Sequence, residues 1–388
     1  MKIIYVTTAI REDDYREFTK LWSKAPNPSN QNFHNKLIRS LAINNEVEVI
    51  SLRPFSKQYC SIRSLKKDFK EDKNINWHYL TIKRGKLSRL SVINKESKAI
   101  AKTLDLSKCI IFTDTINPVC IKTANAISKG NNVPVIGICT DSPSNISGTS
   151  RAYTLYLLKQ AAKCYGYIAL TSDLNDLFNP NERKSLLIEG VVEEVKKDAN
   201  LMSEKNPYFF FGGALLEKYG VFNLIEAFKL LNDNSIDLYL CGHSGNLDKI
   251  HDSIKGYKNI HFLGTLPVSH VLQYEMYSLA NINPRPFNMD LDRLSIPSKT
   301  LEYLASGSPT ISVKNTKLQK HFENDAIWAK SGSVEDLHAA MLKVLDLNKK
   351  ERKALGKQAK EKVLELYSLD SVNKKINEFL EFFKSGIN

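Results

Sequence analysis

The feature that most constrains the fold of this sequence is an alternation of short β-branched runs and longer helical patterns, which starts again after a polar stretch. Such an alternation predicts parallel sheets covered by helices. The polar stretch at residues 196–207 indicates a linker, so we expect an α/β protein with two Rossmann-like, doubly wound domains at residues 1–195 and 208–366. Ligands of such sheets collect at the carboxyl ends of the strands, and two domains that face each other give a cleft.

The expected elements follow from hydrophobic periodicity and from the positions of glycine and proline. The expected strands lie at residues 2–7, 46–52, 76–81, 109–113, 133–139, 165–169, 185–188, 208–212, 237–241, 260–263, 280–284 and 309–313. The expected helices lie at residues 30–43, 94–104, 118–128, 153–163, 219–231, 246–254, 268–278, 297–306, 334–345, 349–366 and 369–383.

The chain has 388 residues, which suits two or three domains with cores of their own. No apolar run approaches the roughly 20 residues of a membrane span. Residues 1–8 indicate a first strand and not a signal peptide, so we expect a cytoplasmic protein. The six cysteines form no C-x-x-C pair and no metal-ligand spacing, which favours free thiols in a reducing compartment.

The net charge of +13 calls for an anionic partner, and residues 57–102 are especially basic. Nucleic acid, an anionic membrane surface and phosphorylated substrates all fit this charge, and so does a generally basic, solvated surface. The sequence has no zinc-finger spacing, no aromatic RNA-binding signature and no helix-turn-helix pattern, so we do not expect nucleic acid as the partner.

Residues 295–311 combine a helix start, a positive charge, a carboxylate and a glycine-proline stop. We expect Pro297 just inside the helix, with Ser295 or Ser298 capping its free amides. A helix N-terminus attracts phosphate, and Lys299 adds a full charge at the same place. Glu302, one turn further on, is placed to accept hydrogen bonds from a ribose. The segment has the features of a nucleotide-sugar site.

Two glycine-containing loops follow strands of the second domain. Gly212 and Gly213 would let the backbone approach a ligand closely, and Lys218 at the mouth of the next helix suits a phosphate. Gly242 and His243 follow the next strand, where glycine leaves room for a base or a phosphate. An ordinary turn explains each loop equally well or better when it is considered alone.

Arg285 follows the strand that precedes the phosphate-ready helix, and its guanidinium suits a diphosphate held at residues 297–300, where Thr300 lies. Between the strand and the helix stand Asp290, Asp292 and Arg293, for which we expect a solvated loop.

In the first domain, Asp141 ends a buried strand, where a carboxylate could meet an acceptor hydroxyl or a donor sugar. His34 begins the first long helix near the expected cleft, although a histidine there is more often a surface or capping residue than a catalytic one. No Ser-His-Asp, Cys-His or metal constellation emerges from the sequence. We therefore expect neutralisation of phosphate without a metal, by a helix dipole and the cations Lys218, Arg285 and Lys299.

The second domain resembles that of family 4 retaining glycosyltransferases of GT-B fold, in particular a capsule and exopolysaccharide subset. The landmarks that carry the resemblance are residues 212–221, 262–266, 283–286 and 297–311. Two features depart from the family pattern: Leu294 stands where the first of two glutamates is usual, and Gly213 replaces an arginine.

The resemblance implies transfer of a sugar from a nucleotide donor with retention of configuration. It implies that Glu302 binds the ribose, that Lys218 and a second basic group bind the diphosphate, and that Asp141 or His34 lies near the acceptor. The donor site would comprise Gly212, Gly213, Gly242, His243, Ser298, Lys299, Thr300 and Glu302. The C-terminal helix at residues 367–388 would cross back onto the first domain.

We therefore expect a retaining hexosyltransferase that uses a nucleotide sugar, a UDP-sugar by the commonest case of the family, and no cofactor or metal. The expected acceptor is a glycan or a saccharide on a lipid diphosphate, in surface polysaccharide synthesis at the inner face of a membrane. The alternative is a non-catalytic subunit of the same fold that binds and stabilises a partner transferase, which the missing first glutamate supports. A nucleotide-sugar epimerase would need a carboxylate and base arrangement that the sequence does not contain.

Overall fold

The structure is a computed structural model that describes residues 1–22, 28–56, 60–61, 64–145, 150–198 and 206–384. These residues form two compact units, each described here by itself. The first unit comprises Met1–Val191, Arg293–Ser295 and the segment that begins at Leu369. The second comprises Val192–Asp292 and Ile296–Ser368.

The first unit is built on a sheet with the strand order β10-β9-β8-β7-β1-β2-β5-β4. All neighbouring pairs are parallel except β4 with β5, so the antiparallel strand lies at one edge. The chain reverses its direction of strand addition between β1 and β7, which makes their carboxyl ends the switch point of this sheet. The strands are β1 (Lys2–Thr7), β2 (Glu46–Ser51), β4 (Asp68–Asp72), β5 (Ile75–Tyr79), β7 (Cys109–Asp114), β8 (Val135–Cys139), β9 (Gly166–Ala169) and β10 (Ser185–Leu187), with a separate antiparallel pair β3 (Ser64–Leu65) and β6 (Ile82–Lys83).

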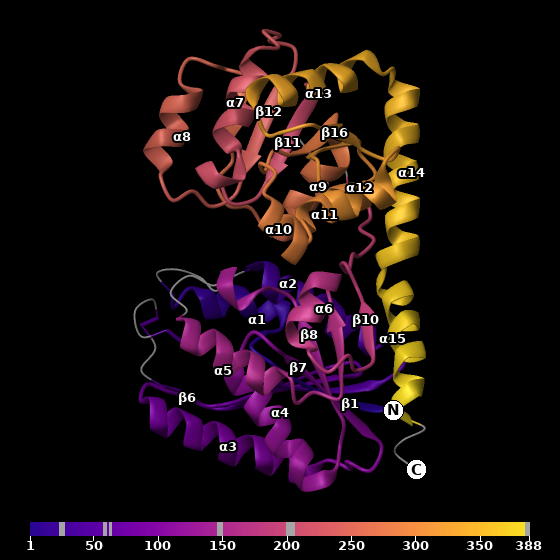
Figure 1. The fold of residues 1–388 in the computed structure, drawn as a ribbon. Coiled ribbons are helices and arrows are strands. Elements are labelled where there is room, and N and C mark those ends of the chain that lie inside the picture. The colour runs from indigo at the N-terminus through magenta and orange to yellow at the C-terminus, as the bar shows by residue number, and fades with distance from the viewer. Residues whose placement is uncertain (23–27, 57–59, 62–63, 146–149, 199–205, 385–388) are drawn as a thin grey trace. The chain divides into compact units, whose positions relative to one another are not determined.

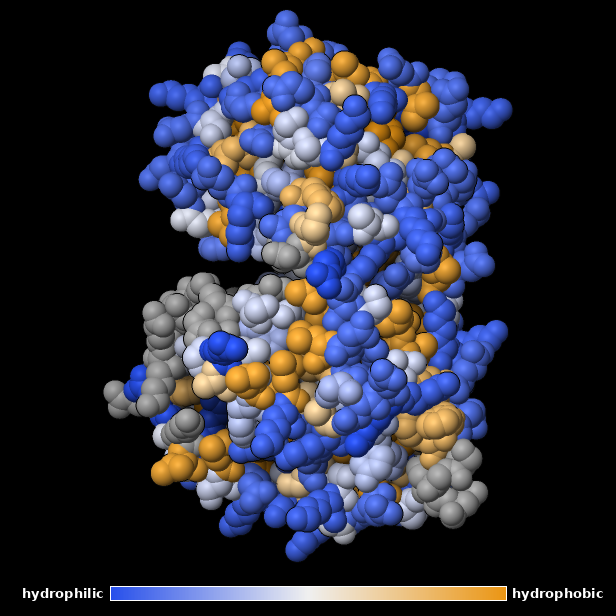
Figure 2. All heavy atoms as spheres, in the orientation of Figure 1, coloured by the Kyte–Doolittle hydropathy of each residue, from blue (hydrophilic) through white to orange (hydrophobic). Residues whose placement is uncertain are grey.

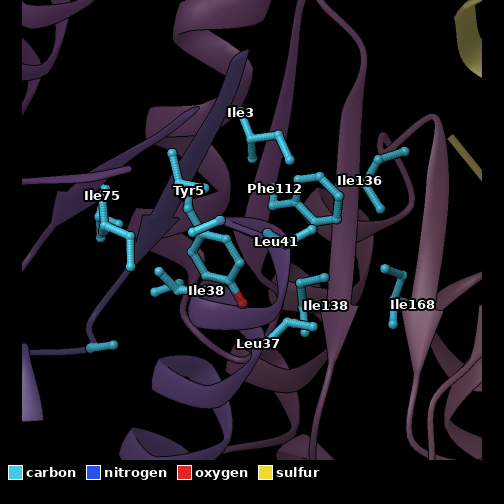
Figure 3. Packing of buried hydrophobic residues seen from close by; sticks show 14 of the residues in the cluster. Ile3, Tyr5, Leu37, Ile38, Leu41, Ile75, Phe112, Ile136, Ile138 and Ile168 are labelled. Atoms are coloured by element: carbon cyan, nitrogen blue, oxygen red, sulfur yellow. The ribbon is translucent and has the colours of Figure 1, made fainter. Parts of the chain in front are cut away.

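Helices cover both faces of the first sheet (Figure 1). Side chains of a strand alternate between its faces, so Ile3 and Tyr5 enter one hydrophobic cluster while Ile4 and Val6 enter the other. The cluster around Tyr5 is drawn in Figure 3, where Phe112 and residues of α2 surround its ring. The helices are α1 (Glu12–Thr19), α2 (Pro28–Leu41), α3 (Lys86–Thr103), α4 (Pro118–Asn131), α5 (Arg151–Ala161), α6 (Ser172–Phe178) and α15 (Leu369–Lys384), with a short 3-10 turn η1 (Pro143–Asn145).

The second unit contains a parallel sheet in the order β13-β12-β11-β14-β15-β16. Numbered within this unit, that order is the 3-2-1-4-5-6 arrangement of a doubly wound fold, so the switch point lies between β11 and β14. The strands are β11 (Tyr208–Gly212), β12 (Asp237–Cys241), β13 (Ile260–Phe262), β14 (Ala280–Asn283), β15 (Thr310–Val313) and β16 (Ile327–Ala329). The helices are α7 (Val221–Lys229), α8 (Leu247–Ile254), α9 (Val268–Tyr277), α10 (Met289–Leu294), α11 (Ser298–Ser306), α12 (Thr316–Phe322), α13 (Val334–Asp346) and α14 (Lys349–Tyr367), with a 3-10 turn η3 (Glu217–Tyr219).

The C-terminal helix α15 packs on the first unit, where Val372, Ile376 and Leu380 join the same cluster as Leu37 and Ile38 of α2. The second unit begins at Val192, whose amide donates to the carbonyl of Tyr367 at 2.8 Å. Of the stretch expected as a linker, residues 199–205 lie outside the described residues.

Several expected boundaries were wrong. Helix α3 begins at Lys86, eight residues before the expected Asn94. Hydrophobic periodicity did not predict this part of the helix, because its first two turns expose most of their side chains and lack a clear apolar stripe. The edge strand β4 was missed, since its sequence Asp-Phe-Lys-Glu-Asp is polar and largely exposed. Among the described residues, no helix has both the length and the apolar content that a membrane crossing requires.

Candidate functional site

The site begins with helix α11, which starts beside the switch point of the second sheet. Pro297 occupies the N-cap position, one residue before the helix and not inside it as expected. The side chain of Pro297 makes no capping hydrogen bond, and capping by Ser295 or Ser298 stays a prediction. Gly307 ends the helix in the left-handed conformation, with φ of 80°. The helix start follows the carboxyl end of β14, where the positive end of a helix dipole favours an anion.

Tyr303 ties this helix to the end of β11. Its hydroxyl accepts from the amide of Gly212 at 2.9 Å and donates to the carbonyl of Gly212 at 3.1 Å. The side chain has no exposed surface. These two hydrogen bonds hold the Gly212–Gly213 turn and α11 in one fixed relation.

The two glycine loops pack directly against each other. Gly242 has φ of 141°, and a Cβ there would lie 1.7 Å from the carbonyl oxygen of Gly213. The Gly213 amide donates to Cys241 O and the Leu215 amide to the carbonyl of His243, both at 2.8 Å. The imidazole of His243 is exposed beside this contact. Glycine is required at position 242 by the close approach of backbone, which a single loop sequence could not reveal.

Lys218 and Arg285 come together around one aromatic ring. The ammonium of Lys218 lies 5.1 Å and the guanidinium carbon of Arg285 lies 5.3 Å from the ring centroid of Tyr219. Gly220 has φ of 78°, and a Cβ there would lie 2.2 Å from the carbonyl oxygen of Pro284. That close approach brings the loop after β14 against the turn after β11. Two cations near one half-buried ring form a site with a charge that suits a diphosphate.

Lys299 does not stand free at the helix start. Its ammonium lies 2.9 Å from an oxygen of Glu302 and 3.6 Å from an oxygen of Glu275 on α9. Burial lowers the pKa of Lys299, but the carboxylates of Glu302 and Glu275 outweigh that effect and raise it above its ordinary value. Lys299 therefore remains a cation, engaged by two carboxylates.

The hydroxyl of Thr300 has a structural role. It accepts from the side-chain amide of Asn283 at 2.9 Å and lies 3.0 Å from the hydroxyl of Ser312, and Thr300 is fully buried. Its backbone amide donates to Pro297 O at 2.9 Å. The hydroxyl of Thr300 thus docks α11 on β14 and β15, and a contact of Thr300 with the donor stays a prediction.

The loop after β14 was expected to be solvated, and for Asp292 this was wrong. Asp292 is buried and accepts from the side-chain amide of Asn315 at 2.6 Å and from the Thr316 amide at 3.0 Å, and it also binds the Thr316 hydroxyl. Asp292 thus anchors the start of α12. Arg293 is exposed, as expected, and the side chain of Asp290 lies outside the described part of the chain.

In the first unit, Asp141 lies just beyond the carboxyl end of β8 and is half-buried. Its side chain accepts from the amide of Ser142 at 2.7 Å. The strand end is the part of this unit where a ligand of a doubly wound sheet is expected.

His34 was expected near the acceptor, and the structure contradicts direct contact. The residue has no exposed surface; its Nδ1 lies 2.7 Å from the hydroxyl of Tyr5, and its Nε2 lies 3.5 Å from a carboxylate oxygen of Asp114. The reason is visible in the sequence: His34, Leu37, Ile38 and Leu41 follow the i, i+3, i+4, i+7 spacing of one buried helix face. His34 is a core residue beneath the switch point of the first sheet.

Sequence reasoning missed three residues that shape the site: Glu275, Tyr303 and Tyr219. Glu275 and Tyr303 lie among buried residues of α9 and α11, where the sequence predicts only packing in the core. No local sequence pattern identifies a buried carboxylate. Tyr219 follows Lys218 directly, and an aromatic residue next to a proposed phosphate lysine was the available signal. Among the described residues, no group of three or more His, Cys, Asp or Glu side chains gathers as a metal site.

Residues 192–362 match the family described as "Glycosyl transferases group 1". This match covers the second unit almost entirely and less than half of the whole chain. Among curated proteins, none matches the sequence significantly. The match supports the predicted glycosyltransferase activity.

Solved structures of glycosyltransferases match the whole chain. The sucrose-phosphate synthase of Thermosynechococcus elongatus superimposes with a TM-score of 0.71 at 12% identity, covering 100% of both chains. The α,α-trehalose 6-phosphate synthase of Burkholderia multivorans gives 0.66 at 11% identity, covering 100% of this chain and 99% of its own. Anabaena HepE, in complex with UDP and glucose, gives 0.65 at 13% identity, covering 98% of this chain and 100% of its own. At these identities the likeness establishes the fold, which is GT-B as predicted.

Proposed function

We propose that the chain is a retaining glycosyltransferase of the family 4 capsule and exopolysaccharide subset, which transfers a hexose from a UDP-sugar. The observation that carries the proposal is the pair of cations Lys218 and Arg285 around Tyr219, in the segments that follow β11 and β14 at the switch point of the second sheet. Glu302 lies on α11, the helix that precedes β15. The complex of HepE with UDP and glucose supports uridine as the nucleoside. A subunit that only stabilises a partner would not need the paired cations.

In the proposed reaction, Lys218 and Arg285 neutralise the departing diphosphate. The start of α11 adds the positive end of a helix dipole. Departure of the nucleoside diphosphate leaves an oxocarbenium-like sugar. The acceptor hydroxyl attacks from the same face, with retention, and its proton passes to an oxygen of the departing diphosphate. Fixed charges aimed at the developing negative charge supply much of the rate, and no metal is required for this role.

The proposed acceptor is a glycan or a saccharide on a lipid diphosphate, bound on the first unit. Asp141 at the end of β8 is the proposed acceptor-side carboxylate, because it is half-buried at the edge where such sheets bind ligands. His34 has no direct part in this proposal, since it is buried.

We propose that the first unit docks on the inner face of an anionic membrane through α3 and α5. Leu87 is 83% exposed on α3 and Leu155 is 60% exposed on α5, and the exposed residues Lys83 and Arg84 shortly precede α3 in the sequence. Figure 2 displays hydrophobic side chains among hydrophilic ones over these helices. Of the basic segment expected from the sequence, residues 57–59 and 62–63 lie outside the described residues.

Sedimentation with vesicles tests the membrane proposal. Binding should require anionic lipid and weaken with salt, at about 1 kcal/mol per cation near the surface. Leu87→Ser should reduce binding, while Leu247→Ser, which alters a half-exposed leucine of α8 in the second unit, should not. Binding that ignores both lipid charge and salt would refute the membrane proposal.

Donor binding and hydrolysis across UDP-, GDP- and ADP-sugars test the enzyme proposal. Glu302→Ala should reduce donor binding or turnover at least about tenfold, or 1.4 kcal/mol. Lys218→Gln and Arg285→Gln should each weaken UDP more than uridine, whereas Lys249→Gln, an exposed lysine paired with Glu217, should not. If no nucleotide sugar binds at about millimolar concentration, which corresponds to a binding free energy near −4 kcal/mol, the proposed function is refuted.

A further inference from the structure

Glu275 is a buried carboxylate that the proposed reaction does not use. It stands on α9 with no exposed surface, and one of its oxygens lies 3.6 Å from the ammonium of Lys299. A buried carboxylate is costly unless a cation or hydrogen-bond donors compensate it. The pairing therefore favours a Lys299 side chain directed toward the interior of the unit, between α9 and α11.

The same ammonium holds Glu302. Lys299 and Glu302 are one turn apart on α11, with 2.9 Å between nitrogen and oxygen, and the ammonium also lies 5.8 Å from the ring centroid of Tyr303. Glu302 is 18% exposed at its side chain, so it can still meet a ligand. The ammonium has three donors, enough to serve both carboxylates.

The charge of this trio argues against phosphate as its ligand. Glu275, Lys299 and Glu302 together carry a net charge of −1 when all are ionised, which disfavours a diphosphate at the ammonium. The two cations near Tyr219 carry +2 and suit the diphosphate far better. The expectation that Lys299 adds its charge to the phosphate site therefore conflicts with its surroundings.

We propose that Lys299 is a positioning residue, which Glu275 holds in place and which fixes the Glu302 carboxylate for the ribose hydroxyls of the donor. This inference rests on the proposed nucleotide-sugar function. Glu302 has several rotatable bonds, and a carboxylate already fixed in its binding geometry loses less conformational entropy when the ribose arrives. Because Tyr303 holds the same helix to Gly212, the oriented carboxylate is also fixed relative to the glycine loop.

Titration calorimetry of the full chain with three probes tests the proposal. The ratio of the affinities for UDP and 2′,3′-dideoxy-UDP, called here the hydroxyl preference, measures what the ribose hydroxyls contribute to binding. The ratio of the affinities for UDP and uridine measures what the diphosphate contributes. In the wild-type protein we expect UDP to bind at least about tenfold more tightly than the dideoxy analogue, as for hydrogen bonds to a charged group. Glu302→Gln should remove most of that preference.

Lys299→Met should likewise reduce the hydroxyl preference to about threefold or less, while it leaves the UDP-to-uridine ratio within about threefold of wild type. Glu275→Gln should lower the hydroxyl preference by an intermediate factor. The matched control is Lys229→Met, which breaks an i,i+3 pair with Glu226 on α7 and should change neither ratio. If Lys299→Met does not fold, the double variant Glu275→Gln/Lys299→Met removes both charges of the pair and carries the same prediction.

Two results would overturn the proposal. One is a Lys299→Met protein that keeps the hydroxyl preference and loses at least about tenfold in the UDP-to-uridine ratio, which would make Lys299 a phosphate ligand. The other is a variant in which neither ratio changes. A wild-type protein that binds no UDP would instead refute the proposed function, so the two failures are distinguishable.

Discussion

Replacing Tyr303 by phenylalanine isolates the contact that joins the glycine loop to the donor helix. The substitution keeps the buried ring and removes the hydroxyl, which bonds both the amide and the carbonyl of Gly212 at 2.9 and 3.1 Å. Leaving a buried backbone group without its partner costs about 1–3 kcal/mol. With two such groups at Gly212, we expect a loss of about 2–6 kcal/mol in the stability of the second unit.

Hydrogen exchange at the Gly212 amide measures this loss where it occurs, which matters because two units need not unfold together. A loss of about 2 kcal/mol corresponds to exchange roughly 30-fold faster. Tyr167→Phe is the matched control: it removes one buried hydrogen bond, to Ala161 O at 2.9 Å, in the first unit. That control should destabilise by about 1–2 kcal/mol and leave Gly212 exchange unchanged. Unaltered Gly212 exchange in Tyr303→Phe would refute the claim that this hydroxyl secures the loop.

The remaining predictions concern backbone shape and pH. In thermal unfolding, Gly220→Ala should destabilise the protein by at least about 2 kcal/mol more than Gly256→Ala. Both glycines have positive φ, but only a Cβ at Gly220 would meet backbone atoms, since it would lie 2.2 Å from the carbonyl oxygen of Pro284. Equal losses of stability in the two variants would contradict this prediction. Burial raises the pKa of Glu48, but hydrogen bonds led by that of His78 outweigh it and lower the pKa below the ordinary value. The stability from Glu48 should thus be present above about pH 4.5 and fall away below it in denaturant titrations. Glu48→Gln should flatten that loss, and an identical pH profile for the variant would show that Glu48 contributes nothing.

The fold was predictable because both sheets are buried on two faces. Strands such as β1 and β12 read as continuous apolar runs, and their bounds Lys2–Thr7 and Asp237–Cys241 were predicted to the residue. Polar edge elements such as β4 (Asp68–Asp72) carry no such run and were missed. Hydrophobic periodicity therefore identifies the centre of each sheet and fails at its margins.

The site was predictable only as far as local sequence determines it. The helix at Ser298–Ser306 and its glycine stop were expected, since proline and glycine act locally. The ion pair between Lys299 and Glu275 joins residues 24 positions apart on different helices, and local spacing does not reveal it. The burial of His34 was predictable, because the residue shares one helix face with the apolar residues Leu37, Ile38 and Leu41.

A crystal structure of the full chain with UDP tests the central claim most directly. The account predicts the diphosphate beside Lys218 and Arg285 at the start of α11, with the ribose hydroxyls on Glu302. UDP bound at another part of the chain, or in this unit with its diphosphate away from both cations, would contradict the account.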